Sequence, residues 1–171
     1  MAINISPNDH IQGSDNAPIE LVEYGDYQCP YCRKAYHIVK EAQKELGNDL
    51  KFVFRNFPLT DLHPNALNAA VATEVACAQG KFWDMHDIIF ENQKFLDDSY
   101  LMQYAKIIGL DIEKFESDFG KDQFYDKVKE DYKSGELNGV EGTPTFFING
   151  RLFEGNWMGP EFLEYLKMVI K

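Results

Sequence analysis

Two of the three cysteines in the chain, Cys29 and Cys32, are separated by only two residues in the segment QCPYCR. A pair at this spacing suits a redox couple that opens and closes a disulfide, half of a zinc site, a structural cross-link, or no chemistry at all. A structural cross-link over so short a span closes almost no loop and therefore stabilises the fold little. The choice among the others depends on the residues around the pair.

A zinc site needs about four ligands, so the zinc alternative requires further cysteine or histidine residues close to the pair. The candidates elsewhere in the chain are Cys77, His10, His37, His63 and His86. None of them forms a second close pair in the sequence. We therefore expect no metal site, and no cofactor other than a redox-active Cys29–Cys32 disulfide.

The elements around the pair predict that Cys29 lies at the start of a helix. Residues 19–24 (IELVEY) have a strand pattern, and the helix pattern that follows has Pro30 in the first-turn position that tolerates proline. Unpaired backbone N–H groups and the positive end of the helix dipole stabilise a thiolate at such a position. Cys32, nearly one turn further on, is expected to be more buried and less acidic, which suits one attacking and one resolving sulfur.

An acidic residue precedes the cysteines on the predicted strand. Alternation places Glu23 on the same face as Ile19 and Leu21, which are apolar. Burial there would raise the pKa of the carboxyl group and would allow it to exchange a proton with Cys32. The alternative is a glutamate at the strand end that reaches solvent.

A proline opens the predicted third strand, in the segment TPTFFI that begins at Thr143. Because proline cannot donate a hydrogen bond to a sheet, Pro144 indicates a strand start or a cis turn. Packed beside the cysteines, it would form a wall of a binding site in which the Thr143 backbone pairs with an extended peptide. Pro30 and Tyr31, between the two cysteines, complete the expected substrate-binding residues.

The order of predicted elements is β-α-β, a helical block, then β-β-α. A second strand is predicted at residues 50–57, and the βαβ order implies a parallel pair with a right-handed crossover. Residues 62–138 have helical periodicity almost throughout. The dipeptide Asn149-Gly150 predicts a hairpin, and an amphipathic helix follows Pro160. Without the block, an α/β sandwich remains: two parallel strands, an antiparallel hairpin and a helix on each side.

CPYC after the first strand, GTPTFFING downstream and the helical block between them resemble the DsbA-like branch of the thioredoxin superfamily over about residues 16–171. The resemblance implies a thioredoxin fold with a helical insertion and a thiol:disulfide oxidoreductase activity. It makes Cys29 the nucleophile and Cys32 the resolving thiol. It also makes Pro144 the cis-proline and places Glu23, six residues before the first cysteine, where the family carries a buried acid.

The chain differs from the DsbA prototype at both positions that tune the reduction potential. The CPYC sequence also occurs in glutaredoxins, and threonine before the proline is shared with disulfide isomerases. We expect an intermediate potential, because the helix start and Arg33 favour the Cys29 thiolate whereas Asp26 and Glu23 oppose it. A reductase or isomerase of the same fold, and a non-catalytic peptide-binding chaperone or adaptor module, remain as alternatives.

The implied organisation divides the chain into three parts. Residues 1–15 form an N-terminal arm, residues 16–60 and 139–171 form the thioredoxin-fold domain, and residues 61–138 form the inserted helical subdomain. Outside the motifs, Cys77 is expected to be a small apolar residue of an alanine-rich helix, with a regulatory or third redox thiol as the alternative. His37 is expected on the surface and His63 in a structural role.

Composition limits the partners. The chain has 171 residues, of which 44% are hydrophobic, so its core needs no disulfide, and the formal net charge of -11 disfavours nucleic acid and anionic membranes. No run approaches the roughly 20 apolar residues of a membrane span. The start has no signal-peptide pattern, so a cytoplasmic location is expected, although an exported form with its leader removed would look the same. We expect a monomer that acts on polypeptide thiols and disulfides with a redox partner protein or glutathione.

Overall fold

The centre of the computed structural model, which describes residues 2–170, is a mixed sheet with the strand order β1-β3-β2-β4-β5. The strands are β1 (His10–Gly13), β2 (Ile19–Gly25), β3 (Leu50–Asn56), β4 (Thr145–Ile148) and β5 (Arg151–Leu152). β2 and β3 are parallel, and the other neighbouring pairs are antiparallel. The predicted parallel pair and hairpin are therefore confirmed. β1 is an edge strand within the segment predicted to be an arm, and the end residues Met1 and Lys171 lie outside the described part.

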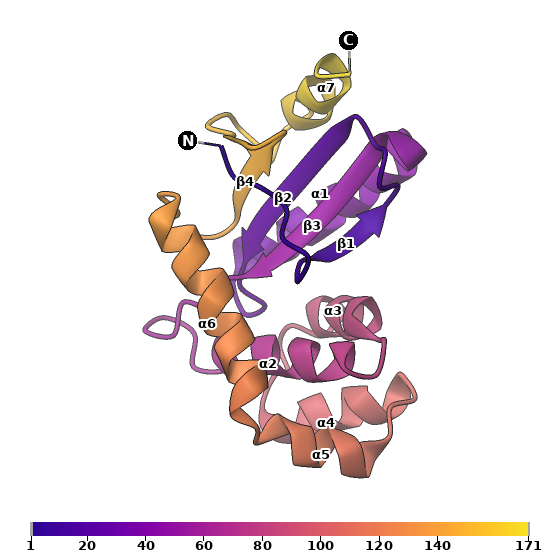
Figure 1. The fold of residues 1–171 in the computed structure, drawn as a ribbon, viewed down its shortest axis with the longest axis vertical. Helices are drawn as coiled ribbons and strands as arrows, with labels where there is room; N and C mark the ends of the chain where they lie inside the picture. The colour runs from indigo at the N-terminus through magenta and orange to yellow at the C-terminus, as the bar shows by residue number, and fades with distance from the viewer. Residues whose placement is uncertain (1, 171) are drawn as a thin grey trace.

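The helices cover the sheet and extend beyond one end of it (Figure 1). They are α1 (Pro30–Leu46), a short 3₁₀ helix (Gly47–Asp49), α2 (Ala66–Cys77), α3 (Phe82–Glu91), α4 (Asp98–Ile107), α5 (Ile112–Phe119), α6 (Asp122–Leu137) and α7 (Glu161–Met168). The predicted helical block thus consists of α2 to α6. Figure 1 shows α2 to α5 below the sheet and α6 running back alongside it. The division into domains stays a prediction.

One face of the sheet packs against both α1 and α7. Leu21 and Phe54 on this face share a core with Val39 of α1 and Phe162 of α7. The prediction of a helix on each side of the sandwich is therefore wrong for these two helices. The opposite face is covered by the N-terminal segment and by α6, a helix whose periodicity says nothing about where it docks.

The hairpin between β4 and β5 forms for the local reason that the sequence predicts. Asn149 and Gly150 both have positive φ angles, 48° and 82°, which a two-residue turn of this kind requires. Asn149 also ties the hairpin to β2, since its backbone N–H donates to the carbonyl oxygen of Glu20 at 2.8 Å. This contact fixes the end of β4 against β2.

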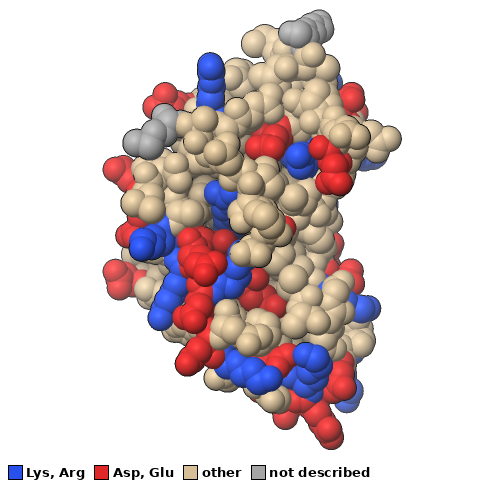
Figure 2. All heavy atoms as spheres, in the orientation of Figure 1, with Lys and Arg blue, Asp and Glu red and all other residues tan. Residues whose placement is uncertain are grey.

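The charged surface on the face shown in Figure 2 is mixed. Basic and acidic side chains alternate along α6 and around the end formed by α4 and α5. Across residues 2–170, no helix combines the length and the apolar character needed to span a membrane.

Gly135 lies where α6 meets the sheet, and a side chain there has no room. A Cβ atom at Gly135 would lie 2.7 Å from Cε2 of Phe57 and 3.1 Å from Cδ1 of Tyr24. Both rings are buried, and Phe57 is stacked on Tyr132 with 4.2 Å between ring centroids, so neither ring moves aside easily. The glycine is what allows α6 to approach this face closely.

We expect Gly135→Ala to lower the free energy of unfolding by about 1–3 kcal/mol through overpacking. In an unobstructed helix, the same substitution raises the free energy of unfolding by about 1 kcal/mol. The sign of the measured change therefore distinguishes the effect of close packing from that of helix propensity. Denaturant unfolding measures the change. Gly120→Ala is the control, because nothing lies within 4 Å of a Cβ atom there. A Gly135→Ala protein as stable as the unchanged chain would contradict the packing argument.

Candidate active site

Cys29 is the N-cap residue of α1. Its backbone is extended, with φ -71° and ψ 123°, and Pro30 follows in the first turn, where its missing N–H costs nothing. The backbone N–H groups of Cys32 and Arg33 donate to the carbonyl oxygen of Cys29 at 3.1 Å and 3.2 Å. The predicted position of this sulfur at the start of a helix is confirmed.

The two cysteines have opposite acid–base properties. The hydrogen bond from the Cys32 thiol is the largest influence on Cys29 and, against the opposing effect of burial, lowers its pKa to about 5. Burial, together with the hydrogen bond to Cys29, raises the pKa of Cys32 well above its ordinary value. Cys32 is fully buried, and both are thiols in this structure. At neutral pH the site therefore holds one thiolate and one thiol, the asymmetry expected from the sequence.

Glu23 lies on β2, on the face that packs against α1. It is 2% exposed, and its Oε1 atom has no hydrogen-bond partner among the described residues. Burial, with a smaller contribution from the negative charge of Cys29, raises the pKa of Glu23 to about 8. The expected burial is confirmed, and the solvent-reaching alternative is wrong. A carboxyl group with this pKa can hold or release a proton at neutral pH beside Cys32.

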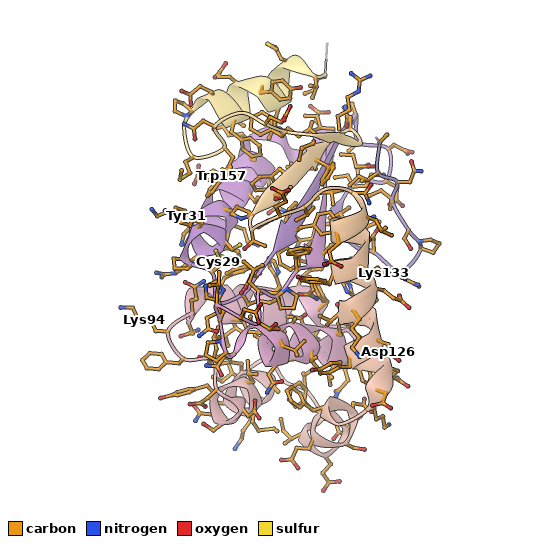
Figure 3. All side chains as sticks on the ribbon, turned by 90° about the vertical axis from the view of Figure 1, so that its left-hand side faces the viewer. Cys29, Tyr31, Lys94, Asp126, Lys133 and Trp157 are labelled. Atoms are coloured by element: carbon orange, nitrogen blue, oxygen red, sulfur yellow. The ribbon has the colours of Figure 1, made fainter. Side chains whose placement is uncertain are left out.

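The segment before β4 forms the wall opposite the cysteines. The peptide bond between Thr143 and Pro144 is cis, so that predicted alternative is confirmed. The carbonyl oxygen of Thr143 lies 3.7 Å from the Cys29 sulfur. Pro30 and Tyr31 are exposed beside it. In Figure 3, Cys29 and Tyr31 lie between Trp157 and Lys94, away from the Asp126 and Lys133 side chains of α6. The structure thus gathers every predicted site residue around one sulfur, while their catalytic roles stay predictions.

Asp26, which is buried, pairs with the partly exposed His63 next to the cysteines, and the sequence did not predict this pair. Oδ2 of Asp26 accepts hydrogen bonds from the backbone N–H of Leu59 at 2.9 Å and lies 2.8 Å from Nδ1 of His63. The backbone N–H of Asp26 lies 3.4 Å from the Cys32 sulfur. His63 therefore does more than begin a helical segment: it helps to anchor the loop that carries the cysteines.

Gln93 connects the helical block to the active-site loop. Its side-chain amide donates to the carbonyl oxygens of Tyr27 at 3.0 Å and Cys29 at 2.7 Å. A glutamine 64 residues away from Cys29 carries no local sequence signal, so no pattern could have identified it. Arg33, expected to favour the thiolate, is exposed and is not among the groups that chiefly lower the pKa of Cys29.

Three other predictions concern residues outside the site. Cys77 belongs to the alanine-rich helix, as predicted, but its side chain is exposed. The buried stretch of α2 ends at Ala76, and Cys77 is the last residue of the helix, where the chain leaves the core. His37 is exposed, as predicted. Across residues 2–170, no group of three or more histidine, cysteine, aspartate or glutamate side chains is arranged to hold a metal ion.

Residues 5–168 match a family model described as thioredoxin, and the chain belongs to that family. Its fold is the thioredoxin fold with a helical insertion, like that of the DsbA-like thiol:disulfide oxidoreductases, and the Cys29–Cys32 pair lies at the start of α1.

Solved structures support this class. BdbD from Bacillus subtilis, described as the oxidised form, is 26% identical, has a TM-score of 0.84, and is matched over 95% of this chain and 92% of that chain. The thiol-disulfide exchange protein α-DsbA2 from Wolbachia pipientis is 22% identical with a TM-score of 0.80, over 96% of this chain and 86% of that chain. At this lower identity, the second likeness shows the fold alone.

The chain is also similar to parts of larger proteins. It is 41% identical over 161 residues to the Na(+)/H(+) antiporter NhaA 1 of Mycobacterium sp. (strain KMS), covering 93% of this chain and 26% of the antiporter. It is 39% identical over 158 residues to NhaA 1 of Salinispora arenicola, covering 92% and 24%. This chain therefore spans about a quarter of the length of these curated relatives.

Proposed function

We propose that this chain is a thiol:disulfide oxidoreductase that exchanges disulfides with polypeptides through Cys29 and Cys32. One observation carries the proposal: Cys29 is the N-cap of α1, its pKa is lowered to about 5, and a neutral thiol donates to it from Cys32. The thiolate is the attacking species in disulfide exchange, so this sulfur is ready to react at neutral pH. The chain covers about a quarter of the length of the antiporters, so their ion transport carries no weight in this proposal.

In the oxidising direction, a substrate thiolate attacks the Cys29 sulfur of the Cys29–Cys32 disulfide. A bond forms between substrate and Cys29, the Cys29–Cys32 bond breaks, and the electron pair leaves on Cys32. Because the pKa of Cys32 is well above its ordinary value, the departing sulfur takes up a proton, and Glu23 with its pKa of about 8 supplies it. The second cysteine of the substrate, as its thiolate, then attacks the substrate sulfur that is bonded to Cys29. The substrate disulfide forms, the bond to Cys29 breaks, and Cys29 leaves as a thiolate.

In the reducing direction, the same steps run backwards. The Cys29 thiolate attacks a substrate disulfide, and Cys32 loses its proton to Glu23 as it displaces the substrate. Both directions need a peptide held with its sulfur over Cys29. β4 pairs with β2 from Thr145 onward, so the backbone of Thr143 lies ahead of the sheet pairing and faces Cys29. This placement supports an extended polypeptide as the substrate.

The reduction potential tests the proposal and gives the direction of electron flow. Because a pKa of about 5 for Cys29 falls between about 3.5 and about 7, the values of strongly oxidising and reducing CxxC proteins, we expect a potential between about -270 and about -120 mV. The measurement equilibrates the chain with glutathione buffers and counts thiols by mass spectrometry. A pair that forms no disulfide in any of these buffers would leave only the non-catalytic binding module.

A further inference from the structure

A second cluster of potentially reactive side chains lies outside the Cys29 site. The Cys77 sulfur, at the end of α2, lies 3.8 Å from Nδ1 of His10 on β1. The other ring nitrogen of His10, Nε2, lies 2.9 Å from both carboxylate oxygens of Glu74, which is three residues before Cys77 on α2. Thiol, imidazole and carboxylate therefore follow one another in the order that activates a nucleophilic cysteine.

The imidazole and the carboxylate in this cluster are held in place from several sides. His10 is 8% exposed and Glu74 is 5% exposed. The His10 ring stacks on Phe82 of α3, with 3.6 Å between centroids and an angle of 8° between the planes. Oε2 of Glu74 also accepts a hydrogen bond from the side-chain amide of Asn56 at 3.0 Å. This base is oriented by three elements and does not depend on one mobile surface rotamer.

A pocket of about 440 Å³ opens beside the Cys77 sulfur. His10 and Glu74 line it with Cys77, Asn8 and Lys127 contribute polar groups, and Phe124 contributes an apolar surface. Cys77 itself is exposed, while the imidazole and carboxylate behind it are buried. A concave site of this volume is in the range of small-molecule sites, which favours a small reactant over a folded protein surface.

We propose that Cys77, His10 and Glu74 form a second thiol-exchange site, separate from Cys29 and Cys32, at which Cys77 forms a mixed disulfide with a low-molecular-weight disulfide.

The exchange at Cys77 needs no reactant other than the small disulfide. In the reactive form, Cys77 and His10 hold one proton between them, which lies on Nδ1 of the imidazole, and Glu74 stabilises the imidazolium. The Cys77 thiolate attacks one sulfur of a small disulfide, R–S–S–R. The Cys77–S–S–R bond forms as the S–S bond of the reactant breaks, and the released R–S⁻ takes the proton from His10. Cys77 is oxidised, the departing sulfur is reduced, and a small thiol reverses the step.

The charge on His10 agrees with this geometry. Burial alone lowers the pKa of His10, but the hydrogen bond with Cys77 and the pairing with Glu74 outweigh burial and raise it to about 9. The positive charge of Lys127 on α6 acts in the opposite direction. The imidazole therefore carries its proton at neutral pH.

The other carboxylates near the cluster, Asp131 and Asp9, are each paired with a cation. Lys127 donates to Asp131 at 2.7 Å, and Arg55 donates to Asp9 at 2.8 Å. His86 of α3 is buried, and burial holds its pKa well below the usual range, so it stays neutral. Glu74 is the carboxylate in contact with the imidazole.

The experiment uses the full-length Cys29→Ser/Cys32→Ser protein, in which Cys77 is the one remaining thiol because the chain has 3 cysteines. The probe is dithionitrobenzoate, an aromatic disulfide whose released thiolate absorbs visible light. At neutral pH we expect Cys77 to react about tenfold faster than cysteine in an unstructured peptide, and to keep reacting below the free-thiol pKa of about 8.5. Oxidised glutathione is the second probe, with mass spectrometry to locate the adduct on Cys77.

In the same background, Glu74→Gln is expected to lower the neutral-pH rate about fivefold to tenfold, since it removes the charge that stabilises the imidazolium. Glu130→Gln, which removes an exposed carboxylate of α6, is the matched control and should leave the rate within about twofold. A Glu74→Gln protein that reacts as fast as its parent would overturn the proposal. If that variant does not fold, the pH profile of the parent decides, because a profile equal to that of the peptide cysteine overturns it as well. Neither result bears on Cys29, which is absent from every protein in the test.

Discussion

A Cys29→Ser variant exchanges disulfides with a dithiol peptide roughly a thousandfold more slowly than the unchanged chain. The serine hydroxyl forms no disulfide and is not ionised at neutral pH, whereas the pKa of Cys29 is lowered to about 5. Cys32 cannot replace it, because that sulfur is fully buried and its pKa is well above the ordinary value. The rate is followed by the fluorescence change of a peptide that carries two cysteines.

Two further variants sharpen this test. Cys77→Ser removes the remaining thiol and should leave the peptide rate unchanged, since that sulfur belongs to a different site. Cys32→Ser keeps the nucleophile and should accumulate a mixed disulfide on Cys29, visible by mass spectrometry, because no resolving thiol is present. Exchange that survives Cys29→Ser would remove this residue from the mechanism. A binding module would instead retain the peptide after alkylation of Cys29 and show no exchange in any variant.

The Glu23→Gln variant should be more stable than the unchanged chain and should exchange disulfides more slowly. The pKa of Glu23 is about 8 in the folded protein against 4.5 for an ordinary glutamate, so the folded state holds its proton more tightly. This contribution to stability is fully present below pH 4.5 and is lost as pH rises through 8. At neutral pH, replacing this carboxyl group with an amide that does not ionise should raise the free energy of unfolding by on the order of 1–3 kcal/mol.

The loss of rate has a different cause from the gain in stability. Glutamine cannot donate or accept the proton that Cys32 gains or loses, so the step at that sulfur should slow about tenfold to a hundredfold at neutral pH. The substitution keeps the size and shape of the side chain, so a change in rate reports the loss of proton transfer and not a change in packing. The combination of higher stability and lower rate is the signature of a buried acid retained for its chemistry.

Urea unfolding of the oxidised protein from acidic to alkaline pH measures the stability effect, because Cys29 does not titrate in that form. Glu20→Gln, on the same strand but only partly buried beside Lys51, is the control and should change stability by less than about 1 kcal/mol. Stopped-flow exchange measures the rate. A Glu23→Gln protein with the same pH dependence as its parent would show that this carboxyl group does not titrate near neutrality.

The features that the sequence predicted correctly depend on local patterns. Pro30 after a strand predicts the helix start at Cys29, the alternation of β2 predicts that Glu23 is buried, and Asn149-Gly150 predicts the hairpin. Each follows from backbone geometry within a few residues. The helix-start cysteine and the buried acid could therefore be placed before their contacts were known, whereas the cis form of the bond before Pro144 was one of two alternatives and followed from the family resemblance.

Tertiary packing alone decided the rest, because the contacts join segments far apart in the chain. Gln93 reaches the carbonyl oxygen of Cys29 from 64 residues away, and His63 pairs with Asp26 from 37 residues away. The sequence pattern predicts Cys77 as part of an apolar helix, yet β1 places His10 beside it from 67 residues away. Periodicity shows which face of a helix is apolar. It does not show which surface that face packs against or which polar group lies beside the end of the helix.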